Sequence, residues 1–94
     1  MSNIEAFNNY RRKWVGMIVL YYFTKEEKKE CGRYNPIPSI VLKVCKYGLF
    51  DLMVPCPEGK TFTARNVAIK ANDEDLGVWD YTDQYKNDYR NLNN

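Results

Sequence analysis

The sequence contains no histidine among its 94 residues. Histidine is the commonest general base near neutral pH and the usual partner of a nucleophilic serine or cysteine. The chain also shows no glycine-rich phosphate loop and no cluster of metal-ligating residues in its place. We therefore expect a protein that is not an enzyme and that uses neither a cofactor nor a metal.

Cysteine is scarce as well. Cys31, Cys45 and Cys56 are widely spaced and form no C-x-x-C pair. Without histidine they would supply at most three of the four ligands of a structural zinc site, and a set of disulfides would leave one thiol over. We expect three reduced thiols, buried or half-buried.

Long hydrophobic runs are missing too. A membrane span needs roughly 18 to 20 apolar residues, and the longest apolar run, residues 14–23, has only the length of a strand. The N-terminus carries Glu5 and no apolar stretch with a small-residue cleavage site, so no secretory signal is visible. These features predict one small cytoplasmic domain, in the host cell if the source is a virus, with no membrane partner.

Charge is divided unevenly along the chain. Residues 1–70 hold 12 Lys and Arg against 6 Asp and Glu, a net charge of +6. Residues 71–94 hold 2 against 6, a net charge of −4. A basic body with an acidic tail indicates an anionic ligand, masking of the body by the tail, or solubility alone.

The first 13 residues predict a short helix. Residues 2–5, Ser-Asn-Ile-Glu, have the form of a capping box, and apolar residues recur at helical spacing from Ile4 to Trp14. Residues 11–13, Arg-Arg-Lys, fall in the last turn, where positive charge suits the helix dipole. A phosphate-binding patch is the alternative interpretation of these three cations.

Residues 14–70 have the composition of short strands. In the first strand, residues 15–23, we expect both faces to be covered, with Met17, Val19, Tyr21 and Phe23 on one of them. Residues 25–35 read as a polar loop, and Pro36 and Pro38 exclude a central strand position before residue 39. Further strands are expected at residues 39–45, 49–54, 61–64 and 66–69.

The turns and the core follow from the same pattern. Residues 46–48 form a tight hairpin in which Gly48 takes a positive φ, and Lys43 faces Asp51 across it. The alternating apolar positions predict a core made of Ile40, Leu42, Val44, Phe50, Leu52, Val54, Phe62, Val67 and Ile69.

The end of the chain is acidic and rich in tyrosine. After an acidic loop at residues 73–75, Trp79 supplies a large apolar anchor for the end of the barrel. Tyr81, Tyr85, Tyr89 and Leu92 then recur once per helical turn, with Thr82 or Asp83 as the N-cap. We expect a helix whose tyrosine stripe packs on the barrel, on a partner or on a second copy, and we favour a partner or a second copy.

Several motifs occur in a fixed order: residues 16–22 (GMIVLYY), 38–41 (PSIV), 48–54 (GLFDLMV), 66–67 (NV) and 77–80 (GVWD). This series resembles a widespread group of small uncharacterised phage proteins. The resemblance covers about residues 14–80 and implies an SH3-like small barrel, a phage origin and no catalytic residue. The expected organisation is thus mainly β: a helix at 1–13, a small antiparallel barrel at 14–80, and an acidic tail at 81–94.

Eight tyrosines in a chain this short exceed what one small barrel buries, and tyrosine near loops suits recognition. An AT-rich genome would also raise the tyrosine content without any function. We predict a phage accessory protein that binds and blocks or sequesters a host factor, as an anti-defence or host-takeover inhibitor. Its predicted contact residues are Arg33, Tyr34, Tyr47, Tyr81, Tyr85 and Tyr89.

The second hypothesis is a small barrel that binds nucleic acid or a nucleotide. In that case cations would meet phosphates while tyrosines stack on bases. The predicted phosphate-binding residues are Arg33, Lys43, Lys46, Arg65 and Lys70. Self-association through the C-terminal tail is a further expectation.

Overall fold

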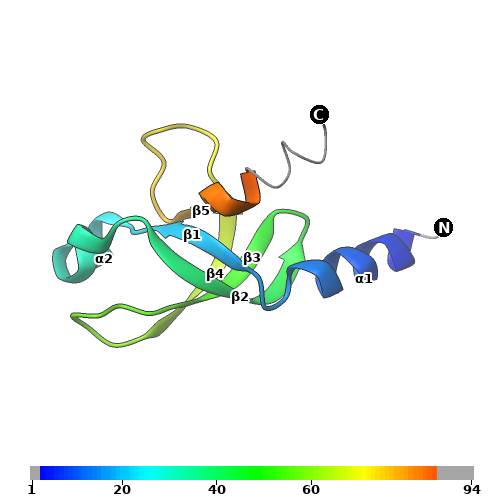
Figure 1. Cartoon of the computed structure of the whole chain (residues 1–94), viewed down its shortest axis with the longest axis horizontal. Coiled ribbons are helices and arrows are strands. Elements are labelled where there is room, and N and C mark those ends of the chain that lie inside the picture. The colour runs from blue at the N-terminus through cyan, green and yellow to red at the C-terminus, as the bar shows by residue number, and fades with distance from the viewer. Residues whose placement is uncertain (1–2, 87–94) are drawn as a thin grey trace.

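The computed structural model describes residues 3–86 and contains a five-stranded barrel with helices at its ends (Figure 1). Its elements are α1 (Asn3–Trp14), β1 (Ile18–Tyr22), α2 (Lys25–Cys31), the 3-10 helix η1 (Gly32–Tyr34), β2 (Ile37–Lys46), β3 (Leu49–Val54), β4 (Phe62–Ile69) and β5 (Val78–Asp80). Residues 83–86 form one further helical turn. The mainly β, SH3-like barrel with an N-terminal helix is confirmed, and so is the helical start of the tail.

The sheet closes on itself in the order β1-β2-β3-β4-β5, with β5 returning to β1. Neighbouring strands are antiparallel except for β4 and β5, which run parallel. Closure removes the free edges that an open sheet of this size would expose. The hairpin between β2 and β3 has Gly48 at a φ of +74°, as predicted.

The predicted core is partly wrong because β2 changes register along its length. Its pairing with β3 shifts between Val41 and Lys43, so the residues that point inward are Ser39 and Val41 before the shift and Val44 after it. A bulge of one residue turns every later side chain to the other face. Ile40 is therefore only half-buried, and Leu42 is exposed.

The last predicted strands are one strand. β4 runs through Asn66, which takes a φ of +53° opposite a register shift in β3. Asparagine tolerates this left-handed conformation better than most residues. The kink lets both Ala64 and Val67 face inward. Ile69 lies beyond the last residue of β4 that pairs with β3 and is exposed, so its predicted core position is wrong. Phe62 is half-buried at the start of β4 and packs against the core.

Pro38 lies within β2, opposite Leu20 of β1. The sequence predicts instead that the strand starts after Pro38. The pairing of β2 with β3 begins only at Ile40, so β2 has one neighbour at Pro38. A proline is tolerated where its missing N–H faces no partner strand. The strand therefore starts at Ile37.

The predicted polar loop at residues 25–35 is instead α2 and η1. Thr24 caps α2: its Oγ1 accepts the Glu27 N–H at 3.2 Å, and Glu27 Oε1 accepts the Thr24 N–H at 2.9 Å. Glu27 Oε1 also accepts a 2.6 Å hydrogen bond from the buried Tyr21 hydroxyl. Burial and then this hydrogen bond raise the pKa of Tyr21 above its ordinary value. A short helix is thus fixed to the barrel by a capping box that the sequence displays.

The cysteines also differ from expectation. Cys31 at the end of α2 and Cys56 after β3 form a disulfide, with Cα atoms 6.0 Å apart, and only Cys45 is free. The prediction of three free thiols is wrong because the unforeseen helix brings Cys31 over the β3–β4 loop. Within residues 3–86 no group of three or more His, Cys, Asp and Glu is placed to hold a metal.

Aromatic rings close the opposite end of the barrel. Trp79 is 1% exposed. Its ring stacks on Phe50 with centroids 4.6 Å apart, and its Nε1 donates to the Gly48 carbonyl at 2.9 Å. Trp14 at the end of α1 packs on both rings, with centroids 5.6 Å from Phe50 and 5.7 Å from Trp79. The expected role of Trp79 as an anchor for the barrel end is confirmed by its burial.

Candidate partner-binding surface

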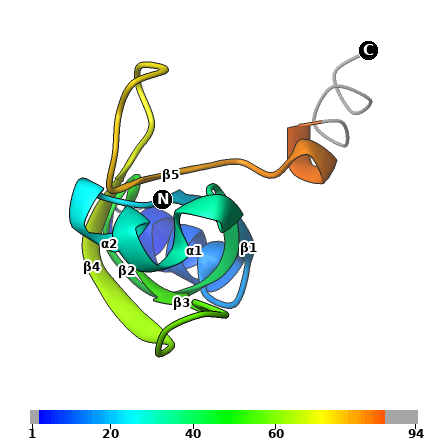
Figure 2. The same cartoon turned by 90° about the vertical axis from the view of Figure 1, so that its left-hand side faces the viewer.

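A shallow recess of about 440 Å³ lies between the start of β1 and the helical turn of the tail. Its lining residues are Gly16, Met17, Ile18, Thr82, Gln84 and Tyr85. A second recess of about 330 Å³ is lined by Arg11, Arg12 and Val15, the residue directly before Gly16. We call the two recesses together with Leu42 the β1 groove. Figure 2 shows the helical turn of the tail standing to one side of the barrel, beyond β1.

The floor of the β1 groove is aliphatic and uncovered. Val15 is 48% exposed, and Ile18 and Leu42 are each 45% exposed. The Gly16 N–H donates to the Val41 carbonyl at 2.8 Å, which places the glycine beside Leu42. A Cβ on Gly16 would meet nothing within 4 Å, so no side chain shields Leu42 from that side. The expectation that both faces of residues 15–23 are covered is therefore wrong at Ile18.

The apolar surface continues around the barrel. Ile18 lies opposite Ile40, and Ile40 lies opposite Met53, so three outward side chains form a row across β1, β2 and β3. Ile40 and Met53 are half-buried. Exposed apolar side chains that are contiguous, rather than scattered, are typical of interaction surfaces.

The rim of the β1 groove is positively charged. Arg11, Arg12 and Lys13 all lie in the last turn of α1. The Arg12 guanidinium donates to Asn9 at 2.8 Å, and the Lys13 ammonium lies 5.9 Å from the centroid of the Tyr85 ring. Over the described part of the chain, none of the three cations forms an ion pair with a carboxylate. Their positive charge suits the C-terminal end of the helix dipole and, because it is not neutralised by such ion pairs, is available to a partner.

The predicted tyrosine stripe begins by packing on its own barrel. The Tyr81 and Tyr85 rings stack 4.9 Å apart, and both contact Trp14, at 5.8 and 5.5 Å between centroids. Thr82 Oγ1 accepts the Tyr85 N–H at 3.1 Å, as predicted for an N-cap. These two tyrosines thus pack in cis, because Trp14 provides an apolar neighbour, and docking of the tail on a partner or a second copy stays a prediction. Tyr89 and Leu92 lie outside the described residues.

The other predicted contact residues lie elsewhere. Tyr47, 60% exposed at the β2–β3 hairpin, packs on Phe7 and Tyr10 of α1 with centroids 5.3 and 4.7 Å away. Arg33 and Tyr34 belong to η1, beside α2 at the opposite end of the barrel (Figure 1). Arg33 donates to the Tyr34 hydroxyl at 2.8 Å and forms an ion pair with Glu58. The five predicted residues that the structure describes thus do not form one surface.

The predicted phosphate-binding cations are dispersed as well. Arg33 and Lys70 already have partners within the chain. The Lys70 ammonium pairs with Asp73 at 3.5 Å and lies 5.3 Å from the Tyr22 ring centroid. Lys43, Lys46 and Arg65 are exposed on β2 and β4.

Lys43 lies opposite Asp51, as predicted. The Asp51 carboxylate accepts hydrogen bonds from the Asn66 N–H at 2.9 Å and the Cys45 thiol at 3.4 Å. Burial, and to a smaller extent the hydrogen bond to Asp51, raises the pKa of the Cys45 thiol. The free cysteine is thus held in its less reactive thiol form.

Comparison with protein-family models, curated proteins and solved structures finds no match to this chain. The resemblance to small phage proteins therefore stays a prediction from the sequence. No helix within residues 3–86 is long and apolar enough to cross a membrane.

Proposed function

We propose that the protein is a non-enzymatic phage accessory protein that binds a host protein in the β1 groove and thereby blocks or sequesters it. The observation that carries this proposal is the uncovered aliphatic floor of the groove beside three cations that form no ion pair with a carboxylate of residues 3–86. The occupant that fits is a segment of the host protein that brings apolar side chains together with carboxylates. Such a segment would bury the floor and meet the positive rim.

The aromatic rings of the groove favour a protein over a nucleic acid. Tyr85 already stacks on Tyr81 and packs on Trp14, so its ring contacts are made within the chain. The exposed apolar side chains of the groove are the aliphatic ones of Val15, Ile18 and Leu42. Aliphatic side chains bury apolar protein surface but offer no π-face to a base. Salt dependence separates the two, since phosphate contacts release counterions and lose affinity steeply with salt.

The test compares capture from bacterial host extract by three immobilised proteins: the wild type, Leu42→Glu and Ile69→Glu. Leu42 lies in the groove, whereas Ile69 is a comparably exposed aliphatic residue on β4 outside it. We expect a host protein that the wild type and Ile69→Glu retain and that Leu42→Glu loses. The purified host protein should then lose its own activity on addition of the wild type but not of Leu42→Glu.

Equal retention by Leu42→Glu would exclude the groove as the binding surface. A captured protein whose activity is unaffected by the wild type would contradict blocking. Retention of oligonucleotides instead of a protein would favour the alternative function, binding of nucleic acid or a nucleotide.

That alternative, a nucleic-acid or nucleotide binder, is supported by one feature, the exposed Tyr47 ring next to Lys46 at the hairpin. Its test is fluorescence anisotropy of a labelled single-stranded oligonucleotide across a salt series. Binding that Tyr47→Ala removes and Leu42→Glu preserves would place the nucleic acid at the hairpin.

For the location we propose the host cytoplasm. A disulfide is more typical of oxidising compartments, so the state of the Cys31–Cys56 pair tests this proposal. Alkylation in intact cells should find both thiols reduced, whereas a persistent disulfide would place the protein outside the reducing cytoplasm.

A further inference from the structure

The loop between β4 and β5, residues 70–77, projects from the barrel (Figures 1 and 2). It carries Asp73, Glu74 and Asp75 against one lysine, Lys70. Asp73 and Glu74 are exposed, and Leu76 nearby is 38% exposed. Asp73 pairs with Lys70 at 3.5 Å, yet its side chain is fully exposed. The loop therefore presents carboxylates beside an apolar side chain, whereas the β1 groove presents cations beside apolar side chains.

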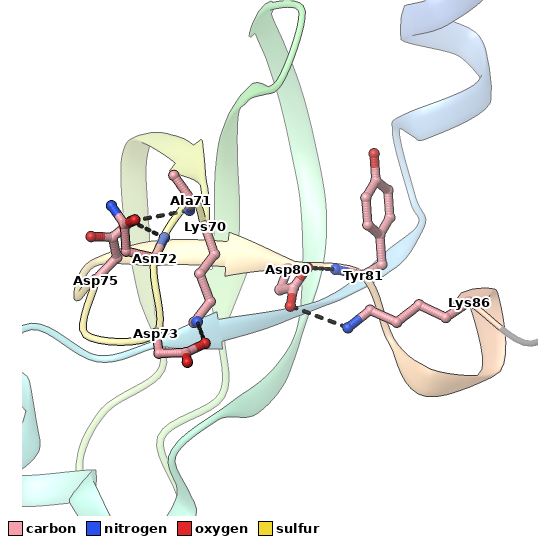
Figure 3. A network of polar contacts seen from close by, with 8 residues as sticks. All are labelled: Lys70, Ala71, Asn72, Asp73, Asp75, Asp80, Tyr81 and Lys86. Carbon is pink, nitrogen blue, oxygen red and sulfur yellow. Dashed lines mark hydrogen bonds and ion pairs between the residues drawn. The ribbon is translucent and has the colours of Figure 1, made fainter.

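Hydrogen bonds within the loop and at its base brace it against the barrel (Figure 3). Asp75 Oδ2 accepts the backbone N–H groups of Ala71 at 3.0 Å and Asn72 at 2.8 Å. These two hydrogen bonds lower the pKa of Asp75. At the base of the loop, Lys70 N–H donates to the Trp79 carbonyl at 2.7 Å and Gly77 N–H to the Tyr22 carbonyl at 2.8 Å. An ordered loop loses little conformational entropy on binding.

The charges of loop and groove are complementary. The groove has Arg11, Arg12 and Lys13 at its rim, and the loop has a net charge of −2. In Figure 2 the loop and the helical turn beside the groove leave the barrel in different directions. The two surfaces are thus presented to different neighbours.

We propose that the β4–β5 loop of one copy occupies the β1 groove of a second copy. In this contact Asp73 and Glu74 meet Arg11 and Arg12. Leu76 covers the aliphatic floor formed by Val15, Ile18 and Leu42. Two different surfaces meet, so the contact is heterologous and adds copies head to tail into a ring or a short filament.

This inference goes beyond host binding but uses the groove assigned under the proposed function. A second copy and a host protein would therefore compete for it. Self-association would hold the protein in reserve until a host protein displaces the loop.

The test is sedimentation velocity of the full chain from micromolar to millimolar concentration. The loop variant is Asp73→Lys with Glu74→Lys, and the groove variant is Arg11→Glu with Arg12→Glu. The control, Glu26→Lys with Glu30→Lys, changes the net charge as much as the loop variant does, but on α2. Circular dichroism verifies that each variant is folded.

We expect the wild type and the control to associate, and each of the other variants alone to sediment as a monomer. Mixing the loop and groove variants should restore association, because each then meets the opposite charge on the other. Raising salt from about 0.1 M to about 1 M shortens the screening length from about 10 to about 3 Å and should weaken the assembly.

A wild type that stays monomeric at the highest concentration and low salt would overturn the proposal. So would a loop variant that associates like the wild type, or a mixture of the two variants that stays monomeric. The loop variant keeps its groove and should still bind the host protein, whereas the groove variant should not. Failure of self-association and failure of host binding are therefore distinguishable.

Discussion

The two ends of the barrel are closed by different chemistry. At the α1 end, Trp14, Phe50 and Trp79 form a buried cluster that Tyr81 and Tyr85 extend outward. At the α2 end, a short polar helix is held by directed bonds: the Thr24–Glu27 capping box, the Tyr21 hydroxyl, the Cys31–Cys56 disulfide and the Arg33–Glu58 ion pair.

This difference decides how each end responds to change. Ring packing is non-directional and draws on many neighbours, so its stabilisation follows the apolar area removed from water. A single directed bond stabilises the fold less than a packed ring cluster does, and it depends on one partner. The bonds to carboxylates also depend on pH, and the disulfide depends on redox state. We expect substitutions at the α1 end to act mainly on global stability and changes at the α2 end to depend on conditions.

The largest effect is expected at Trp79. Trp79→Ala should lower the free energy of unfolding by about 3 to 5 kcal/mol, the range for a buried aromatic truncated to alanine. Urea unfolding followed by circular dichroism measures it. Tyr47→Ala, at an exposed ring of the same end, is the control and should cost much less. A Trp79→Ala protein melting within a degree or two of wild type would contradict a closing role for the ring.

The next effect concerns the disulfide. Cys31→Ser with Cys56→Ser should lower stability by about 2 to 4 kcal/mol, since the bond restricts the unfolded chain. Thiol titration of the oxidised, denatured wild type should find one thiol, from Cys45. Reductant should reproduce the loss in the wild type and leave the double variant unchanged. Three titratable thiols before reduction would show that the bond does not form.

Tyr21→Phe removes the hydroxyl that donates to Glu27 and should cost about 1 to 3 kcal/mol near neutral pH, because the acceptor is charged. The folded state holds the pKa of Tyr21 above the value near 10 of a free tyrosine. Its contribution is thus fully present below about pH 10 and is lost as pH rises through the folded pKa.

The difference between wild type and Tyr21→Phe should therefore shrink at alkaline pH, which melting curves from pH 7 to about pH 11 would follow. A gap that stays constant over that range would show that the folded state does not raise the pKa of Tyr21. Tyr22→Phe, on the outward side of the same strand, is the matched control.

The smallest effect is expected at the cap of α2. Thr24→Ala should cost about 0.5 to 2 kcal/mol by removing the acceptor for the Glu27 N–H. Amide exchange should rise in α2 and stay unchanged in α1. Thr24→Ser keeps the hydroxyl oxygen and should restore most of the protection. Loss of protection in both helices would mean that the cap acts on the whole barrel.

The strands were predictable where one strong pattern decided them. The expected strand at residues 49–54 matches β3, and Gly48 forms the hairpin turn. α2 was missed although Thr24 and Glu27 carry the capping signature, because seven residues rich in lysine and glutamate show no apolar stripe. Ile40 and Leu42 were misplaced because the bulge in β2 depends on the partner strand. Ile69 was misplaced because it lies just beyond the pairing of β4 with β3.

The candidate site was predictable only in its components. The sequence predicts Tyr85 as a contact residue from its spacing and the cations of residues 11–13 as an alternative phosphate-binding patch. It places Val15 and Ile18 on covered faces and Leu42 in the core, which is wrong. The exposure of an aliphatic side chain depends on which side chain packs across from it. The neighbour of Leu42 just before β1 is Gly16, which has no side chain to cover it. The glycine in the sequence is the one signal that a gap exists at that position.

The sequence by itself determined the class of the molecule. Turn residues, alternating apolar residues and two tryptophans are enough for a small β-barrel, because they act through local conformation and side-chain burial. Tertiary structure alone decided which cysteines pair, which face of β2 points inward and which surface stays open. Each of these depends on the distance between residues far apart in the chain, which closure of the barrel sets.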